Sequence, residues 1–452
     1  MKQVRKSWQN TTYFVLSAIG AAVGLGNIWK FPYAIGANGG GYFLLAYIMS
    51  VFFCVLPILV AELAIGKYCK KNTIDAFKDL SKKFNLSQFW NCIPILGLIT
   101  ALLILSFYSV VSGWSLYYLV ISLTGKLSNV TTLDSIAIWT KFSSSAELVI
   151  LCHTLFIFLT AWFVARGINN GLEKLNIITM PILFIILFIL IFYVAIENND
   201  SFIKAIKFIF SFDASGIATS DVLLSALGQA FFSLAVGVGA MMMYGSYMKE
   251  ETMLLKSSYV IVFAQLVVGL LSSIAIFSVV FTTGSSKIAA GPELMFIVIP
   301  SIVSNMAYPQ LMSLSFFVVL FIAALTSSVN IAELLIATLH EKMNLSRKKS
   351  SVIIAIITWF IGSILSLSFN VCNDFLIFNK FNIFEFTIHI STDYMLTIGG
   401  ALIAIYAGWV LPRHLKMEVF TDGNIFIAKI LVFLLKFVSS IIPIIILIFP
   451  NN

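Results

Sequence analysis

"AAVGLGNIWKFP", residues 21–32, lies within an apolar stretch long enough to cross a lipid bilayer, and it decides the fold. The stretch contains Gly24, Gly26, Asn27 and Pro32, which all disfavour a continuous helix. In hydrocarbon each unsatisfied backbone group costs several kcal/mol, so irregular backbone persists only where protein or a polar cavity receives its N–H and C=O groups. The stretch therefore predicts an interrupted helix that lines a site inside the membrane.

The composition is typical of a membrane protein. Of the 452 residues 60% are hydrophobic and 11% are charged, and the mean hydropathy is +1.00, which excludes a water-soluble globular protein. We expect an all-α polytopic protein whose eleven transmembrane segments cover residues 11–35, 42–66, 92–122, 148–165, 175–196, 222–247, 257–283, 311–339, 351–368, 394–411 and 425–449.

Lys and Arg residues predict the orientation, because cytoplasmic loops carry the excess. Most of these residues fall in the cytoplasm when the N-terminus is placed there, and eleven crossings then put the C-terminus outside. The net charge of +8 is explained by this topology and by contact with anionic lipid, so no nucleic-acid partner is expected. The short tails and the Ile/Lys/Asn-rich composition indicate a bacterial inner membrane.

A second interruption is predicted in the sixth span, at "SLAVGVGA", residues 233–240. Close helix packing is the alternative explanation for the glycines of either span. In the first span, for example, Gly20 and Gly24 form a small-xxx-small pair. However, spans 1 and 6 each open a group of five spans, and interruptions at corresponding places in two halves indicate a transporter site near the membrane midplane.

The ends of a broken helix have a chemistry of their own. The amino end is partly positive, the carboxyl end is partly negative, and both carry unpaired backbone groups. The amino end suits a carboxylate, the carboxyl end suits an ammonium group, and exposed carbonyl oxygens suit Na⁺. The two interruptions therefore predict a site for a free amino acid and a sodium ion.

Three motifs together resemble the neurotransmitter:sodium symporter family, and in particular its multi-hydrophobic amino acid transporters: "AAVGLGNIWKFPYAIGANGGGYFLLAY" (21–47), "ALGQAFFSLAVGVGA" (226–240) and "AALTSSVNIAE" (323–333). The resemblance implies the LeuT fold, a 5+5 inverted repeat. It divides the chain into a cytoplasmic N-terminal latch (1–10), a first repeat (11–196), an extracellular loop (197–221), a second repeat (222–411) and an additional span (425–449).

The resemblance also implies two sodium sites. Site 2 would use carbonyl and hydroxyl oxygens of Gly20, Val23, Ala323, Thr326 and Ser327, which are hard ligands that suit Na⁺. Site 1 would use Ala22, Asn27, Ser233 and Gln265. Gln265 replaces the Asn or Asp of relatives, and Gly269 stands where relatives carry a Ser that binds chloride or a Glu that replaces it. Chloride coupling therefore stays open.

Monoamine carriers of the family have an Asp where this chain has Gly24, so the resemblance implies a ligand that brings its own carboxylate. Tyr108 matches the tyrosine that holds this carboxylate. The expected substrate-binding residues carry no charge, which favours hydrophobic or aromatic L-amino acids; they are Ala21, Ala22, Leu25, Gly26, Ile104, Tyr108, Phe232, Ser233, Ala235, Val238, Ser327 and Ile331.

Gates are implied on both sides of this site. The outer gate would pair Lys30 with Asp393, and the inner latch would consist of Arg5 and Trp8 with Tyr247 and Glu341 as partners. Two further acidic residues, Glu62 and Glu333, are expected to accept hydrogen bonds from the unwound backbone.

We therefore expect a sodium-coupled symporter that works by alternating access, as a monomer or a dimer. A symporter for small neutral amino acids is one alternative. An amino-acid-binding receptor that does not transport is another, although no loop or tail is long enough to form a partner domain. No nucleophile–base pair or metal-ligand spacing is found, so we expect no enzyme activity.

Overall fold

The computed structural model describes residues 7–212, 220–282, 294–304, 306–420, 422 and 424–448, and every regular element in these ranges is a helix. Nine of the described helical segments are long and apolar enough to cross a membrane, or ten when the bent pair Thr11–Ala22 and Gly26–Ala37 is counted as one span. The remaining predicted span, 222–247, consists of two shorter helices on either side of an irregular stretch. Helix length alone therefore does not reproduce the count of eleven.

The first half of the chain contains ten α-helices, some of which are joined by π-helical turns (η). They are α1 (Thr11–Ala22), η1 (Gly26–Lys30), α2 (Phe31–Ala37), α3 (Gly41–Met49), η2 (Ser50–Val55), α4 (Leu56–Cys69), α5 (Thr73–Lys83), α6 (Cys92–Leu123), α7 (Thr132–Ser143), α8 (Ala146–Ala165), η4 (Ile168–Glu173), α9 (Lys174–Glu197) and α10 (Asn199–Phe210). The loop predicted over 197–221 thus contains a helix, α10.

The second half begins with the two short helices of the sixth span. Its elements are α11 (Ser220–Leu234), α12 (Ala240–Ser246), α13 (Leu254–Phe281), η5 (Leu294–Val298), α14 (Ile299–Val303), α15 (Pro309–Met343), α16 (Arg347–Ser366), α17 (Ile383–Ile388), η7 (His389–Met395), α18 (Leu396–Ile405), η8 (Tyr406–Val410), α19 (Arg413–Val419), α20 (Ile425–Phe433), η9 (Leu434–Val438) and α21 (Ile441–Ile448).

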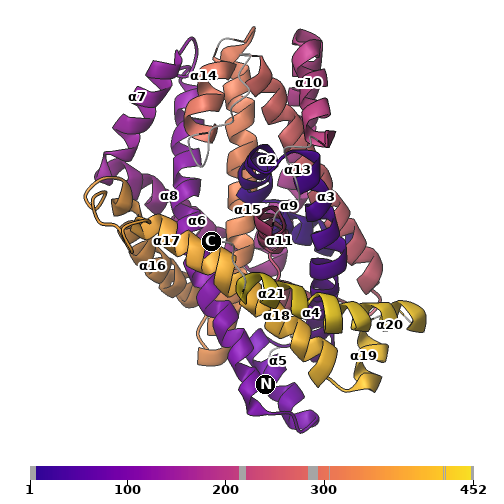
Figure 1. The fold of residues 1–452 in the computed structure, drawn as a ribbon. Coiled ribbons are helices and arrows are strands. Elements are labelled where there is room, and N and C mark those ends of the chain that lie inside the picture. The colour runs from indigo at the N-terminus through magenta and orange to yellow at the C-terminus, as the bar shows by residue number, and fades with distance from the viewer. Residues whose placement is uncertain are drawn as a thin grey trace.

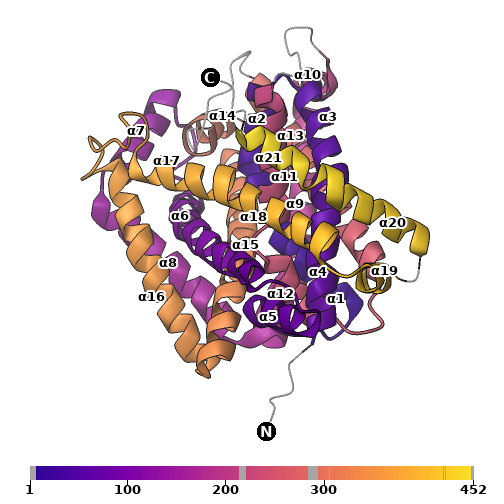
Figure 2. The same cartoon turned by 60° about the horizontal axis from the view of Figure 1, so that its bottom comes forward.

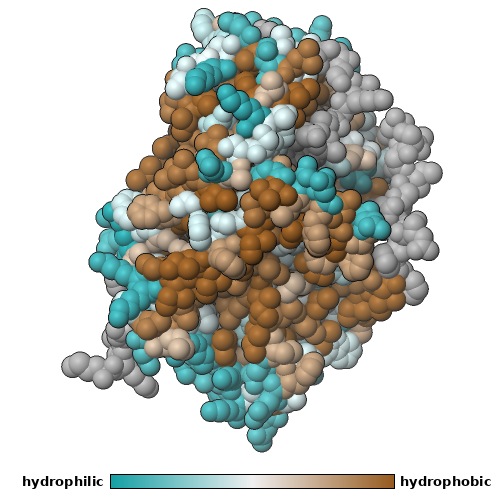
Figure 3. Space-filling model, turned by 90° about the vertical axis from the view of Figure 1, so that its left-hand side faces the viewer, coloured by the Kyte–Doolittle hydropathy of each residue, from teal (hydrophilic) through white to brown (hydrophobic). Residues whose placement is uncertain are grey.

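Two long helices, α6 and α15, run through the bundle and pack closely against each other (Figure 1). Helix α5 lies at one end of the molecule, and α7, α10 and α14 lie at the other. Seen from the side, hydrophobic side chains form a broad band between two hydrophilic ends (Figure 3). This surface is what a protein embedded in a bilayer requires.

Several serines inside the third span bond within their own helix. The Ser106 hydroxyl donates to the Leu102 carbonyl at 2.8 Å, and the Ser112 hydroxyl donates to the Tyr108 carbonyl at 2.6 Å, both one turn earlier in α6. Such bonds allow serine inside a buried helix without a partner on another helix.

Candidate functional site

The first span is interrupted between α1 and η1. Val23 has extended backbone (φ −94°, ψ 98°), and the π-helical turn begins at Gly26. The freed N–H groups find partners across the site: the Leu25 N–H donates to the Tyr108 hydroxyl at 3.0 Å, and the Gly24 N–H donates to the Asn27 side-chain oxygen at 3.3 Å. The interruption thus begins at Val23, one residue before Gly24, and the Leu25 N–H faces α6.

The sixth span is interrupted between α11 and α12. Ala235, Gly237 and Gly239 all have positive φ, at 50°, 98° and 83°. A Cβ atom on Gly237 would lie 2.6 Å from the Leu396 carbonyl oxygen, so this position needs glycine for space as well as for its backbone conformation. Glu62 is fully buried and accepts a hydrogen bond from the Gly237 N–H at 2.7 Å, as predicted.

A cavity of about 40 Å³ lies between the two interruptions. Eleven of the twelve predicted substrate-binding residues line it, from spans 1, 3, 6 and 8. Leu25 is the exception: it lines a neighbouring cavity instead. Sequence reasoning missed two lining residues, Ala101 and Leu396. Ala101 lies three residues before Ile104 on the same helical face, so helical periodicity could have predicted it. No sequence signal indicated Leu396.

The neighbouring outer cavity has a volume of about 290 Å³, and half of its lining residues are aromatic. Gly26, Tyr108 and Phe232 line both cavities, so these residues form the boundary between them. The Phe232 ring packs directly on Gly26, where a Cβ atom would lie 2.8 Å from the ring. The ring and the Tyr108 phenol can therefore cover the inner cavity on its outer side.

Of the residues predicted for sodium site 2, Gly20, Val23 and Ser327 come together between spans 1 and 8, and Thr326 contacts Ala323 within α15. The Ser327 hydroxyl lies 3.2 Å from the Gly20 carbonyl oxygen and 3.1 Å from that of Val23, and Thr326 Oγ1 lies 3.2 Å from the Ala323 carbonyl oxygen. Three carbonyls and two hydroxyls form an uncharged, hard-oxygen set of the kind that suits Na⁺. The residues present fit this ion.

Of the residues predicted for sodium site 1, Asn27 and Gln265 do not meet through their side chains. The Asn27 amide donates to the backbone carbonyl of Gln265 at 3.3 Å rather than meeting its side chain. The Gln265 amide instead donates to the Tyr47 hydroxyl, which also contacts Ser233 Oγ at 2.8 Å. The Gln265 side-chain oxygen is buried and has no hydrogen-bond partner among the described residues. Tyr47 is thus a functional candidate that sequence reasoning missed.

The space near Gly269 explains why this chain lacks a Ser or a Glu there. A Cβ atom on Gly269 would lie 3.0 Å from the Phe31 ring, and this ring packs on Tyr47 with centroids 4.6 Å apart. A larger side chain would displace Phe31.

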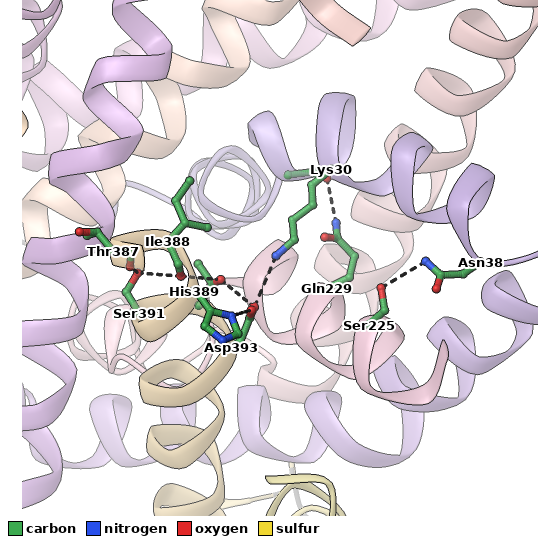
Figure 4. A network of polar contacts seen from close by, with 11 residues as sticks. Lys30, Asn38, Ser225, Gln229, Thr387, Ile388, His389, Ser391 and Asp393 are labelled. Atoms are coloured by element: carbon green, nitrogen blue, oxygen red, sulfur yellow. Dashed lines mark hydrogen bonds and ion pairs between the residues drawn. The ribbon is translucent and has the colours of Figure 1, made fainter. Parts of the chain in front are cut away.

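The outer gate pair is present (Figure 4). Lys30 Nζ lies 3.9 Å from Asp393 Oδ1, and it also lies 5.2 Å from the centroid of the Phe232 ring. Asp393 has a second partner that the sequence analysis did not include: His389 Nδ1 lies 2.7 Å from its Oδ2, one helical turn away. Gln229 stands beside this group and donates to the Gly26 carbonyl at 2.8 Å.

At the other end of the site, predicted to face the cytoplasm and called the inner side below, Trp8 is 1% exposed. Its backbone N–H donates to the Tyr247 carbonyl at 3.0 Å, and its indole N–H donates to the Tyr244 carbonyl at 3.1 Å, so the predicted contact with Tyr247 is present. Arg5 lies outside the described residues. Glu341 accepts from the Asn72 amide at 2.8 Å.

The expectation for Glu333 is wrong. Among the described residues its hydrogen-bond partners are side chains and not backbone N–H groups of the interrupted spans. Instead Glu333 is fully buried, pairs with Arg347 at the start of α16, and accepts from the Tyr247 hydroxyl at 2.9 Å. It therefore ties α15 to α16 and to the segment after α12.

Comparisons with known proteins agree with this geometry. Residues 5–135 and 134–450 match the model of the Sodium:neurotransmitter symporter family. The chain is similar to the uncharacterized sodium-dependent transporter YhdH of Bacillus subtilis, with 33% identity over 419 residues that cover 92% of this chain and 90% of the relative. It is also similar to an uncharacterized sodium-dependent transporter of Haemophilus influenzae, with 30% identity over 99% of this chain and 98% of the relative.

Among solved structures, the crystal structure of MhsT in complex with L-phenylalanine matches with a TM-score of 0.91 and 32% identity, over 98% of this chain and 99% of that one.

Proposed function

This chain belongs to the sodium:neurotransmitter symporter family, and we propose from that premise that it imports hydrophobic and aromatic L-amino acids together with Na⁺. The family is one of membrane transporters and not of enzymes. The fold shared with MhsT, a protein solved with bound L-phenylalanine, supports an amino acid as the substrate.

One observation carries the substrate class. A Cβ atom on Gly24 would lie 2.5 Å from Ser327 Oγ and 2.8 Å from the Tyr108 hydroxyl oxygen. No acidic side chain fits at this position, and none lines the cavity between the interruptions. A substrate amine must therefore meet backbone carbonyls, and the substrate must supply its own carboxylate for the Tyr108 hydroxyl. The other lining side chains are mostly apolar, which favours an apolar substrate side chain.

Coupling follows from which spans each ligand joins. Na⁺ at site 2 would join Gly20 and Val23 of span 1 to Ala323, Thr326 and Ser327 of span 8. The substrate would bridge spans 1, 3, 6 and 8, so both ligands favour the arrangement in which spans 1 and 8 are close. Each then raises the affinity for the other by the same factor. Release on the inner side requires the contacts of Trp8 to break.

The small volume of the central cavity favours a second candidate, a symporter for small neutral amino acids. About 40 Å³ holds no aromatic side chain, so Phe or Trp would have to displace the Phe232 ring towards the outer cavity. Glycine or alanine would need less displacement.

Uptake in proteoliposomes tests both candidates. The purified chain is reconstituted, and uptake of labelled Leu, Phe, Trp and Gly is measured with a Na⁺, K⁺ or proton gradient. We expect Na⁺-driven uptake of Leu, Phe and Trp, whereas uptake of Gly alone would select the second candidate. Binding without uptake would indicate a receptor.

A double variant tests sodium site 2. Thr326→Ala with Ser327→Ala removes both hydroxyls, and we expect it to abolish sodium-stimulated binding. Ser328→Ala is the matched control, because this buried serine lies on the same helix and donates to the Leu325 carbonyl, not to the cluster. Unchanged sodium dependence in the double variant would remove the site.

A further inference from the structure

A groove of about 720 Å³ runs along the surface between α8 and α16, which lie side by side (Figure 2). Its lining is apolar over most of its length and is strongly exposed at Phe158 and Ile356 (67% and 59%). The lining residues are Thr154, Ile157, Phe158, Ala161, Trp162, Ala165, Arg166, Lys348, Ser351, Val352, Ala355, Ile356 and Trp359.

The two ends of the groove differ in chemistry. Arg166 and Lys348 lie at one end, and at the other the Trp359 indole donates to the Thr154 hydroxyl at 2.8 Å. At 1.5 Å per residue, the helical stretch from Thr154 to Arg166 is about 18 Å long. One leaflet of the hydrocarbon core is about 15 Å thick, so the groove has roughly the length of one leaflet.

The basic end has no acidic partner among the residues that the structure describes. Neither Arg166 nor Lys348 forms an ion pair there, and no acidic residue lines the groove. Arg347, the neighbour of Lys348, is already paired with Glu333. The Arg166 guanidinium lies flat over the Trp162 ring, 3.4 Å from its centroid, which fixes its position and leaves its N–H groups free.

We propose that this groove binds an anionic phospholipid. The phosphate would be held by Arg166 and Lys348, and one acyl chain would lie along the apolar floor between α8 and α16. Basic pockets between helices suit such headgroups, and the guanidinium fork fits phosphate oxygens in a bidentate manner. A zwitterionic phosphatidylcholine brings its own ammonium group to the basic end and should bind less well.

Charge argues against a second copy of the chain as the occupant. A two-fold interface would place the same patch on both subunits, so Arg166 and Lys348 of each copy would approach those of the other without acidic residues between them. Each basic residue near an anionic lipid contributes about five-fold to binding, so two predict a preference of about 25-fold for an anionic headgroup.

Quenching of tryptophan fluorescence by brominated lipid measures this preference, because Trp162 and Trp359 line the groove. The full-length protein is reconstituted in vesicles of phosphatidylcholine and phosphatidylglycerol, with the bromine on one lipid or the other. The signal lost in a Trp359→Phe variant isolates the groove. We expect brominated phosphatidylglycerol to quench at a far lower fraction than brominated phosphatidylcholine, in a ratio near that of the predicted preference.

Matched variants separate the groove from general surface charge. Arg166→Gln with Lys348→Gln should reduce the preference to less than about 3-fold, as expected when both contributions are lost. Lys82→Gln with Lys349→Gln removes the same charge from two exposed lysines outside the groove and should retain it. Ala355→Phe fills the floor and should reduce quenching by both lipids while the basic end is intact.

Three results would overturn the proposal. The first is an unmodified protein that shows no preference between the two lipids. The second is a preference that survives in the groove variant and disappears in the Lys82/Lys349 variant, which would assign it to the surface as a whole. The third is an Ala355→Phe protein that changes from dimer to monomer by light scattering with unchanged quenching, which would make a second copy the occupant.

Discussion

The two sides of the central cavity are closed in different ways. On the outer side the only ion pair among the described residues that join span 1 to span 10 is Lys30–Asp393, at 3.9 Å, with side chains 35% and 39% exposed. On the inner side Trp8 is 1% exposed, and the carboxylate of Glu333 is fully buried between Arg347 and Tyr247. The outer ion pair is therefore partly exposed to solvent, whereas the inner contacts of Trp8 and Glu333 are buried.

This difference has an energetic consequence. A largely exposed ion pair is worth about 0–1 kcal/mol, so the Lys30–Asp393 contact offers little resistance to opening. Opening the other side would have to break the buried hydrogen bonds of Trp8 and of Glu333. The described conformation should therefore open more readily on the outer side. Loading from outside then needs little energy, and release to the inside needs the combined effect of bound ligands.

Replacing the buried carboxylate should have the largest effect. Glu333→Gln leaves the Arg347 charge buried without its counter-ion, so we expect the inner closure to open at least about 100-fold more often. Hydrogen exchange of the Trp8 amide, which is bonded to the Tyr247 carbonyl, measures this opening. Adding Arg347→Gln should restore much of the protection, while Asp393→Asn at the outer gate should leave it unchanged. Equal effects of Glu333→Gln and Asp393→Asn would contradict the comparison.

Trp8→Phe should have an intermediate effect. The variant keeps an aromatic ring in the inner closure but deletes the indole N–H that donates to the Tyr244 carbonyl. A hydrogen bond of this kind contributes about 0.5–1.5 kcal/mol, so exchange of the inner segment should accelerate about 2- to 10-fold. Trp409→Phe is a control, because its indole donates to the Lys436 carbonyl far from the site. No acceleration in Trp8→Phe would mean that the indole bond is not part of the closure.

Lys30→Arg should strengthen the ion pair that closes the outer side of the cavity. Arginine presents a planar fork that can bind Asp393 through two N–H groups, whereas lysine offers a point charge. We expect substrate dissociation towards the outside to slow by about 2- to 5-fold, consistent with the small energy of an exposed pair. Lys30→Gln is expected to shift the rate in the opposite direction. Dissociation of labelled substrate after dilution gives both rates, and identical rates would show that the pair does not limit exit.

The smallest effect concerns pH at the inner face. Burial raises the pKa of Asp75, but hydrogen bonds from Lys342 and Asn72 outweigh it, so the pKa lies below its ordinary value. A carboxyl group with a lowered pKa stabilises the fold above its ordinary pKa and loses this contribution as the pH falls through the lower value. The protection factors of the α5 amides, which are corrected for the intrinsic pH dependence of exchange, should therefore be constant between about pH 5 and 8 and fall only below about pH 4. Asp75→Asn should abolish this fall, and a fall in protection near neutral pH would contradict the assignment.

The sequence was most informative where the backbone itself is unusual. Glycine clusters at Gly24–Gly26 and Gly237–Gly239 indicated both interruptions, because breaking a helix in lipid leaves few other residue choices. The resemblance then identified nearly all residues that line the cavity. Contacts between different helices were harder to predict from the sequence. Tyr47, His389 and the Glu333–Arg347 pair were missed or misassigned. The reason is that helix rotation decides which face of a continuous span meets which neighbour.

By itself the sequence determined that this protein is a helical membrane transporter with two glycine-rich interruptions, because composition and backbone chemistry are properties of the chain. Only the tertiary structure decided what those interruptions face. It placed Tyr108 on the Leu25 N–H, set Ser327 between two carbonyls of span 1, and directed the Gln265 amide to Tyr47. The reason is physical: these contacts join spans that are far apart in the chain, and the packing of whole helices sets their distances.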